Sequence, residues 1–379
     1  MNQDLTQELA GQVTAAHDAG RPLRIQGGAS KTWLGRAVAG EALAVAGHRG
    51  ILSYEPTELV ITARAGTPLT EIKAALAERG QWLAFEPPHF DARPAPAPAG
   101  GPGADAGATL GGTIACGLSG PARPYAGAAR DFVLGVRIIN GRGEVLRFGG
   151  EVMKNVAGYD LSRLMVGAQG TLGVLLEVSL KVLPRPATEL TLALDLTAGE
   201  AIDRFNRWAG QPLPLSAACH DGERAYVRVA GSEAAVLAAH ARLGGEAVAA
   251  GADFWRGVRE LRHAFFQQPA PLWRLSLPPT APHDPSLGRQ FIDWGGALRW
   301  VQGEQPPWAV AQAAGGHATY YGRGPAGQPD PRAGGQAGDP PGGQVFQPLP
   351  PALLALHQRL KAALDPRGIL NPGRLYPDL

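Results

Sequence analysis

The sequence predicts an α+β protein of two domains, and three observations lead to this fold class. The chain has 379 residues, enough for one or two hydrophobic cores, and its 45% hydrophobic and 18% charged content is typical of a folded globular protein. Strand and helix patterns alternate in its first half. Beyond residue 187, short strands interleave with helices in an order that predicts an antiparallel sheet backed by helices.

The first domain is predicted over residues 1–187. Leu5, Leu9 and Val13 recur at helical spacing, and Gly20 is expected to end that helix. A strand over 58–66 leads to a helix with Thr67 as its N-cap and Pro68 as its first residue, and a strand over 81–85 closes a β-α-β unit. In the run 131–149, the turn NGRGE joins two strands into a hairpin.

The rest of the chain is assigned to a second domain over 188–350 and to a C-terminal helix and tail over 351–379. Two Pro/Gly/Ala-rich segments, 91–106 and 322–344, have a composition that predicts flexible surface insertions.

Composition excludes several classes of protein. The net charge of +2 gives no electrostatic footprint for nucleic acid or an anionic membrane, and no apolar run reaches the roughly 18–20 residues of a membrane-spanning helix. The N-terminus does not read as a secretory signal, and the two cysteines, Cys116 and Cys219, fit a reducing compartment. We therefore expect a cytoplasmic protein that builds no four-cysteine iron–sulfur cluster alone.

Three glycine-rich segments, RIQGGASK, GATLGGTIACGLSG and GAQGTLGV, carry Ser or Thr beside their glycines. Glycine lets a backbone approach a ligand closely, and consecutive N–H groups in such turns form concave nests that bind anions. Three nests spread over the first domain suit an elongated ligand with a central pyrophosphate. In a chain with 52 glycines, each segment taken alone also reads as an ordinary turn.

Four ordered motifs resemble the vanillyl-alcohol-oxidase-type (PCMH-type) FAD-binding oxidoreductases. They are RIQGGASK, TLGGTIACGLSGPARPYAGAARDFVLG, KNVAGYDLSRLMVGAQGTLGVLLEVSLKV and DPRGILNPGRL, and they are most similar to the E-type FAD-binding subunits of bacterial glycolate oxidase. The resemblance implies a PCMH-type domain that holds FAD between two α+β subdomains without a Rossmann sheet. It also implies a smaller antiparallel-sheet α+β cap domain and a C-terminal tail that returns to the FAD domain.

The resemblance assigns cofactor contacts residue by residue, from the loop for the pyrophosphate to the C-terminal return. These are Gly27, Gly28, Ala29 and Ser30; Thr109, Gly111, Gly112, Ala115, Ser119, Gly120 and Arg130; Gly170, Thr171, Gly173 and Val174; and Asn371. Arg24 and Asp131 are candidates that equally suit surface or ion-pair roles. Ala29 stands where some relatives carry the histidine that attaches FAD covalently, so the expected FAD is non-covalent.

Oxidation of a small 2-hydroxy acid needs a cation for the carboxylate and a base for the hydroxyl proton. Catalytic relatives carry an H-x-G-D-G-N-x-H motif, but this chain has GGHATYYGRG in the second domain. The candidates are therefore His317, Tyr320, Arg323 and Arg274, and no metal site is expected because ligand spacing is absent. His317 also reads as a packed histidine, and Arg274 as an arginine stacked on Trp273.

The missing motif favours an FAD subunit that passes electrons within a complex. The resemblance implies that a D-type FAD-linked subunit oxidises the substrate and that an iron–sulfur subunit accepts the electrons. Membrane association is then expected only through the complex. The alternatives are a self-sufficient FAD-dependent 2-hydroxy-acid or alcohol dehydrogenase, and an assembly subunit with a non-catalytic flavin site.

Overall fold

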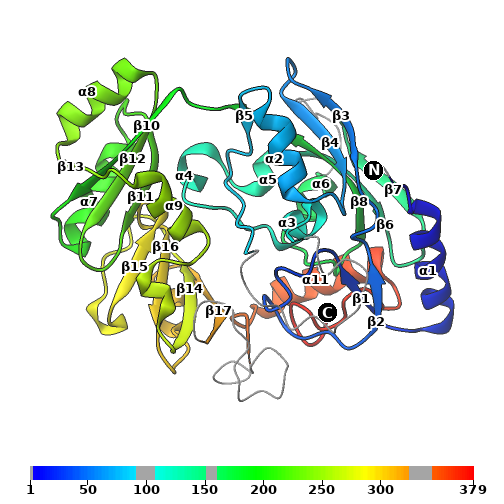
Figure 1. Cartoon of the computed structure of the whole chain (residues 1–379). Helices are drawn as coiled ribbons and strands as arrows, with labels where there is room; N and C mark the ends of the chain where they lie inside the picture. Colours follow the sequence, from blue (N-terminus) through cyan, green and yellow to red (C-terminus); the bar gives the residue numbers. More distant parts are fainter. Residues whose placement is uncertain (1–2, 91–106, 151–159, 324–343) are drawn as a thin grey trace. The chain divides into compact units, whose positions relative to one another are not determined.

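A computed structural model describes residues 3–90, 107–150, 160–323 and 344–379. The chain divides into two compact units, the first formed by Met1–Leu118, Ala128–Pro184 and Pro348–Leu379, and the second by Ser119–Gly127 and Arg185–Gln347. The predicted insertion 91–106, and all but the ends of 322–344, lie outside the described residues. Figure 1 labels the helices and strands of both units.

A five-stranded antiparallel sheet forms the centre of the first unit, in the order β3-β4-β8-β6-β7. Its strands are β3 (Ile51–Glu55), β4 (Val60–Arg64), β6 (Val133–Ile139), β7 (Val145–Gly149) and β8 (Val174–Lys181). β8 pairs with β4 on one side and with β6 on the other, and it is buried from Val174 to Leu180. The predicted hairpin over 131–149 is confirmed by the pairing of β6 with β7.

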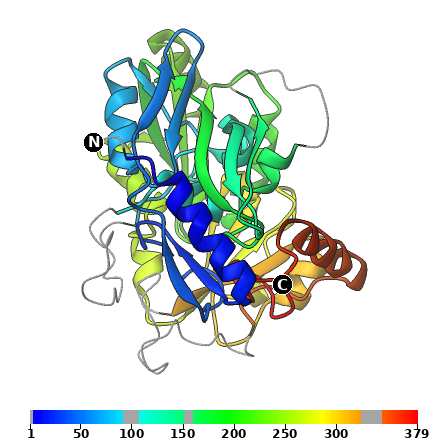
Figure 2. The same cartoon turned by 90° about the vertical axis from the view of Figure 1, so that its right-hand side faces the viewer.

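A second, parallel pair of strands, β1 (Leu23–Gln26) and β2 (Glu41–Ala44), belongs to the same unit. The unit's helices are α1 (Thr6–Ala19), α2 (Leu69–Ala77), α3 (Leu110–Cys116), α5 (Ala129–Phe132), α6 (Leu161–Leu164) and α11 (Pro351–Leu364). α1 ends as predicted at Gly20, which adopts a left-handed conformation (φ 63°). α1 packs against the turn between β6 and β7, where Gly143 meets Thr14, and Figure 2 shows this helix across the front of the unit.

Two local predictions for this unit are wrong. The helix after β4 begins at Leu69, and the Thr67 hydroxyl bonds Gly50 instead of capping it, accepting from the Gly50 N–H (2.9 Å). The predicted β-α-β unit does not form, because β5 (Gln81–Trp82) pairs with β9 (Leu183–Pro184) and not with β4 or its neighbours. The pairing partner of so short a strand is set by a segment far along the chain, which local sequence does not specify.

An eight-stranded antiparallel sheet dominates the second unit, in the order β13-β10-β12-β11-β15-β16-β14-β17, as predicted for this half of the chain. Its strands are β10 (Thr188–Leu194), β11 (Leu215–His220), β12 (Ala225–Gly231), β13 (Glu246–Ala247), β14 (Pro271–Ser276), β15 (Gln290–Asp293), β16 (Leu298–Gln302) and β17 (His317–Arg323). The helices are α4 (Arg123–Ala126), α7 (Ala198–Ala209), α8 (Glu233–Leu243), α9 (Gly251–Arg259) and α10 (Trp308–Ala313).

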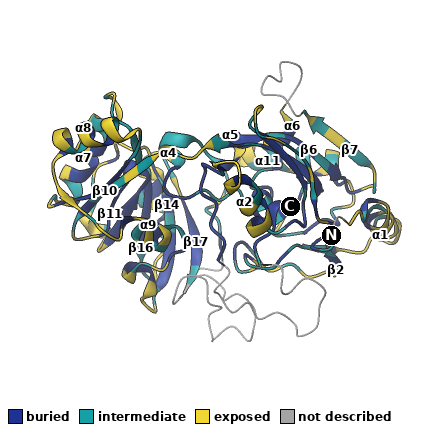
Figure 3. Ribbon diagram, turned by 45° about the horizontal axis from the view of Figure 1, so that its top comes forward, coloured by how far each residue is buried: buried dark blue, intermediate teal, exposed yellow. Residues whose placement is uncertain are grey.

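The helices of this unit bury one face and expose the other. Figure 3 shows α7 and α8 with exposed outer sides beside strands that are largely buried. Inward side chains such as Phe205 of α7 and Val236 of α8 join Val227 and Leu192 of the sheet in one apolar core. A second core around Trp273 and Tyr320 lies at the β14–β17 end of the sheet. Burial of these apolar faces is the main favourable term for the unit.

Acid is expected to destabilise the chain because burial lowers the pKa of His48 and other histidines. His48 is fully buried, and its Nδ1 accepts the Leu5 N–H (3.0 Å), so protonation there would break that bond. The pKa of His48 is lower in the folded chain than in the unfolded chain. As the pH falls through the ordinary histidine pKa, the unfolded chain therefore binds a proton before the folded chain does, and the free energy of unfolding decreases.

The His48→Asn variant keeps an acceptor but cannot titrate. Its melting temperature should therefore fall less between about pH 7.5 and about pH 5.5 than that of the wild type, by on the order of 2 °C. Thermal melts followed by circular dichroism at the two pH values measure this difference. An identical drop in both proteins would contradict the assignment.

Candidate cofactor-binding site

The four backbone N–H groups of residues 27–30, directly after β1, are candidates for a nest that binds an anion. Gly28 is buried, and Gly27, Ala29 and Ser30 are half-buried. Ala29 adopts a positive φ of 59°, which turns the loop. Within the described parts of the chain, none of these four N–H groups donates a hydrogen bond to the protein. Buried N–H groups are almost always paired, so the buried Gly28 N–H and its three half-buried neighbours can bind an anion as their partner.

The first and second glycine segments are in direct backbone contact. A Cβ on Gly28 would collide with the Gly107 carbonyl, and one on Gly27 would lie 2.6 Å from Thr109 Oγ1. Only glycine permits this approach without shifting one of the two loops. The structure thus brings together the nest and the start of α3, as the sequence predicts for a shared ligand.

The second segment is fixed by its own cap and by β4. Thr109 is the N-cap of α3, and its hydroxyl accepts the Gly112 N–H (3.4 Å). Gly111 packs on Ala65, where an added Cβ would lie 2.6 Å from the alanine methyl carbon. Sequence reasoning missed Thr113, one turn further on, whose buried hydroxyl has no partner among the described residues. Its spacing of four from Thr109 was the available signal.

The third segment joins the second through Ala115, whose carbonyl accepts the Gln169 N–H (2.9 Å). Gly170 has a φ of 76° and lies against Asn371, and the Thr171 hydroxyl donates to the Ala168 carbonyl (2.7 Å). Gly173 packs on Ile138. β8 begins at the next residue, Val174, and Gly173 and Val174 are both buried. The three segments therefore form one connected cluster of loops.

Asn371 reaches this cluster from the C-terminal tail, but its side chain is used within the protein. The Asn371 Oδ1 accepts the Ile25 N–H (2.8 Å), and its Nδ2 donates to the Gln169 carbonyl (2.7 Å). The Asn371 amide therefore links β1 to the third segment, and its predicted contact with the cofactor stays a prediction.

The remaining predicted contacts lie outside the three connected segments in the sequence or belong to the other unit. Asp131 is exposed and accepts the Ala128 N–H (2.8 Å), so it caps α5, and its neighbour Arg130 is also exposed. Ser119 and Gly120 belong to the second unit, because α3 ends at Gly117 in a left-handed conformation (φ 63°) and the chain leaves the first unit there. Arg24 lies in β1 and is half-buried.

Lys31 was missed by the sequence analysis, although it directly follows the nest. Its side chain is only 6% exposed, and its Nζ donates to Ser30 Oγ (3.2 Å) and approaches the His89 carbonyl (3.5 Å). A buried cation next to unused N–H groups adds to the attraction for an anion. Burial raises the pKa of Cys116, so this cysteine near Lys31 stays a neutral thiol.

In the second unit, Arg274 and His317 share one face of the sheet. β14 pairs with β17 so that Arg274 opposes Thr319 and Ser276 opposes His317, while Trp273 opposes Tyr320. Successive strand residues point to opposite faces, so Arg274 does not stack on Trp273. Its guanidinium instead lies over the Trp294 ring, 4.9 Å from the centroid. Tyr320 packs on Trp273 in the core and is not brought to His317.

His317 is exposed to solvent at the start of β17, and the pKa of its imidazole is lowered by desolvation from neighbouring atoms and then by the Arg274 charge, so the imidazole is neutral at neutral pH. Trp294 belongs to the short turn Trp294–Gly296 and has a positive φ of 53°; its Nε1 donates to the Gly120 carbonyl (3.0 Å). Among the described residues, no acidic side chain pairs with Arg274. Arg323 ends β17, and its side chain lies outside the described residues.

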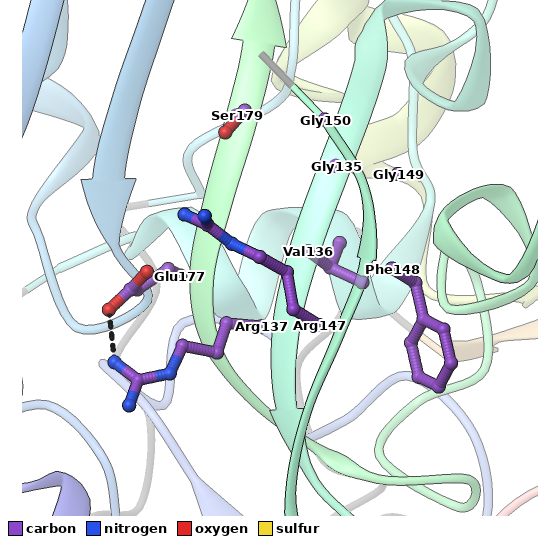
Figure 4. Close-up of a pocket in the computed structure, with 9 residues that line it drawn as sticks. All are labelled: Gly135, Val136, Arg137, Arg147, Phe148, Gly149, Gly150, Glu177 and Ser179. Atoms are coloured by element: carbon purple, nitrogen blue, oxygen red, sulfur yellow. Dashed lines mark hydrogen bonds and ion pairs between the residues drawn. The ribbon is translucent and has the colours of Figure 1, made fainter. Parts of the chain in front are cut away.

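A small polar hollow on β6, β7 and β8 has no place in the predicted site. Figure 4 shows Arg137 and Glu177 pointing toward each other there, 2.7 Å apart, so this ion pair closes one side. In the described parts of the chain, no three His, Cys, Asp or Glu side chains gather to hold a metal ion. None of the helices described is both long enough and apolar enough to cross a membrane.

Comparison with known proteins agrees with this geometry. Residues 4–92 match the model of an FAD binding domain, and residues 347–375 match the C-terminal domain of FAD linked oxidases. Alkyldihydroxyacetonephosphate synthase has a similar fold, with a TM-score of 0.62 over 97% of this chain and 76% of that one, at 14% identity. The matched domains define an FAD-linked oxidoreductase and confirm the predicted cofactor, and the similar fold confirms the predicted fold class.

The sequence relatives narrow the class. Glycolate oxidase subunit GlcE of Escherichia coli (strain K12) is 49% identical over 379 residues, 99% of each chain. Glycolate oxidase subunit GlcD of Bacillus subtilis (strain 168) is 43% identical over 84 residues, which is 22% of this chain and 18% of that protein. D-2-hydroxyglutarate dehydrogenase of Xanthomonas citri pv. viticola is 32% identical over 38% of this chain and 28% of that protein. The chain belongs to the glycolate oxidase subunit GlcE family.

Substitution of Gly28 tests the loop cluster. Gly28→Ala places a Cβ against the Gly107 carbonyl and should cost about 1–3 kcal/mol of unfolding free energy, with a lower content of bound FAD. Gly11→Ala in α1 is the matched control: nothing lies within 4 Å of its added Cβ, so it should stabilise by about 0.5–1 kcal/mol and keep FAD. Urea unfolding and flavin absorbance measure both effects. Equal FAD content in the two variants would refute the cluster as the cofactor site.

Proposed function

We propose that this chain is the FAD-binding subunit of a multi-subunit complex that oxidises glycolate or a similar small 2-hydroxy acid. The observation that carries the proposal is the nest at Gly27–Ser30, whose unused N–H groups lie within the segment that matches an FAD binding domain. The 49% identity to a glycolate oxidase subunit over the whole chain supports the substrate class.

The residues present fit a non-covalent FAD. The N–H groups of Gly27 to Ser30 would hold the pyrophosphate, and the Lys31 ammonium would balance its charge. The segments over 109–115 and 170–174 would line the rest of the cofactor, and Ala29 offers no side-chain atom for covalent attachment. Bound FAD would supply the acceptor for the electrons of the substrate's C2–H bond.

Partner subunits complete the reaction in this proposal. The segment GGHATYYGRG carries a single histidine, His317, where the motif of catalytic relatives carries two, and this favours substrate oxidation by a D-type FAD-linked subunit. An iron–sulfur subunit would take the electrons onward, since this chain has only two cysteines, and Cys219 is buried. The short GlcD match shows that the two kinds of subunit share a related segment.

An assay of the purified chain with glycolate and an artificial electron acceptor tests this division of labour. We expect a yellow protein with bound FAD whose turnover is negligible alone and appears when the chain is co-purified with its partner subunits. Robust turnover by the isolated chain would overturn the proposal. A colourless protein would favour the assembly role without a working flavin site.

One observation supports a second candidate, a self-sufficient 2-hydroxy-acid or alcohol dehydrogenase. Arg274, stacked on Trp294 and unpaired by any described acid, has the chemistry of a carboxylate anchor, and His317 on the same face is a neutral base.

Arg274→Gln separates the two candidates. Under the second, bleaching of the flavin by glycolate in the isolated chain should weaken by about 10-fold or more, because a charged contact to the substrate is lost. Under the first, neither protein bleaches alone. Stopped-flow absorbance of the flavin measures the difference, and Arg289→Gln, a substitution at an exposed arginine paired with Glu223, is the control.

A further inference from the structure

The C-terminal segment holds the first unit together through polar bonds. Four of its residues, Lys361, Asp365, Asn371 and Arg374, are here called the C-terminal clamp. Lys361 is the one buried residue of α11, whereas Leu353 and Leu356 of the same helix are exposed. α11 is therefore attached through the Lys361 ammonium group together with the half-buried Leu354, Leu360 and Leu364.

The buried pair at the start of the clamp is fully bonded. The Lys361 Nζ donates to Asp365 Oδ2 (2.7 Å), to the Leu370 carbonyl (2.7 Å) and to the Thr171 carbonyl (2.8 Å). The Asp365 carboxylate in turn accepts the N–H groups of Ile369 (3.1 Å) and Leu370 (2.8 Å). Such a pair is costly to break, so the tail and the third glycine segment are held in one arrangement.

The tail then runs beside β1, and its residue Arg374 reaches the loop that follows the first glycine segment. The Leu23 N–H donates to the Ile369 carbonyl (2.7 Å), and the Asn371 N–H donates to the Leu23 carbonyl (3.0 Å). Asn371 bridges Ile25 and Gln169, as described above. Figure 1 shows the C-terminus beside β1 and α11.

Arg374 completes the link between the two loops. Its Nε donates to Gln169 Oε1 (3.1 Å), its Nη1 to the Arg36 carbonyl (2.6 Å) and its Nη2 to the Thr32 carbonyl (3.1 Å). Gln169 immediately precedes Gly170, and Thr32 lies two residues after Ser30. One guanidinium thus spans the third glycine segment and the loop that continues from the nest.

We propose that the C-terminal clamp sets the spacing of the first and third glycine segments, and that Arg374 is a positioning residue for the cofactor without touching it. The inference rests on the proposed function to the extent that FAD is the ligand of these loops. Because the planar guanidinium reaches three acceptors at once, lysine is not an equivalent substitute.

A matched pair of tail variants tests the proposal. Arg374→Ala removes the link between the loops, whereas Arg367→Ala removes an arginine that also bonds carbonyls, those of His17 (2.8 Å) and Asp18 (3.1 Å) at the end of α1. After removal of FAD and its stepwise return, quenching of flavin fluorescence should give a Kd raised about 10-fold or more for Arg374→Ala and less than about 3-fold for Arg367→Ala. Arg374→Lys should fall between Arg374→Ala and the wild type. Equal Kd values for the two alanine variants would overturn the proposal.

Hydrogen exchange of the apoprotein separates this inference from the cofactor assignment. Arg374→Ala should speed exchange of the hydrogen-bonded amides beside both of its contacts, and Arg367→Ala should leave them unchanged. These amides are Thr32 and Leu34 in the first loop and Ala168, Gln169 and Thr171 in the third segment. Unchanged exchange in Arg374→Ala would refute the clamp even if FAD binds. A wild-type protein that takes up no FAD would refute the proposed function, while the exchange result would still decide the clamp.

Discussion

Direct packing of one backbone on another is the constraint on which the first unit depends. At Gly28 no side-chain atom fits between the loop and the Gly107 carbonyl, and Gly111 meets Ala65 almost as closely. Since main-chain atoms have fixed dimensions, these contacts set the distance between the loops far more narrowly than flexible side chains would. The same geometry leaves the N–H groups of the first loop without protein acceptors. The close contact of Gly28 with Gly107 and the N–H groups without protein acceptors thus occur in the same loop.

Features encoded over short distances were the ones that the sequence predicted well. The apolar spacing of Leu9 and Val13 with Gly20 defines α1, and the turn after Ile139 defines the β6–β7 hairpin. The sequence also indicated the positive φ at Gly170 and the close backbone contact at Gly28, because glycine adopts such a φ without strain and has no Cβ to block such a contact. Each of these depends on residues a few positions apart, where propensity and sterics act directly.

Features that depend on distant partners were missed or misplaced. Nothing near Asn371 announces that its amide bonds Ile25, 346 positions away. Strand register decided that Arg274 faces Trp294 and that Tyr320 enters the core, although Arg274 and Tyr320 were both candidates for one site. Ser119 and Gly120 continue a motif in the sequence, but the αL residue at Gly117 ends the helix before them, and their roles stay predictions.

The first unit draws on three stretches of chain, and the last of them, Pro348–Leu379, follows the whole second unit. During synthesis on a ribosome, β1 and the glycine loops therefore emerge long before the residues that tie them together. A domain made from consecutive residues can fold as it emerges, but this unit can fold completely only after its last stretch, Pro348–Leu379, has been synthesised. The order of translation thus delays maturation of the loops until the rest of the polypeptide has been made.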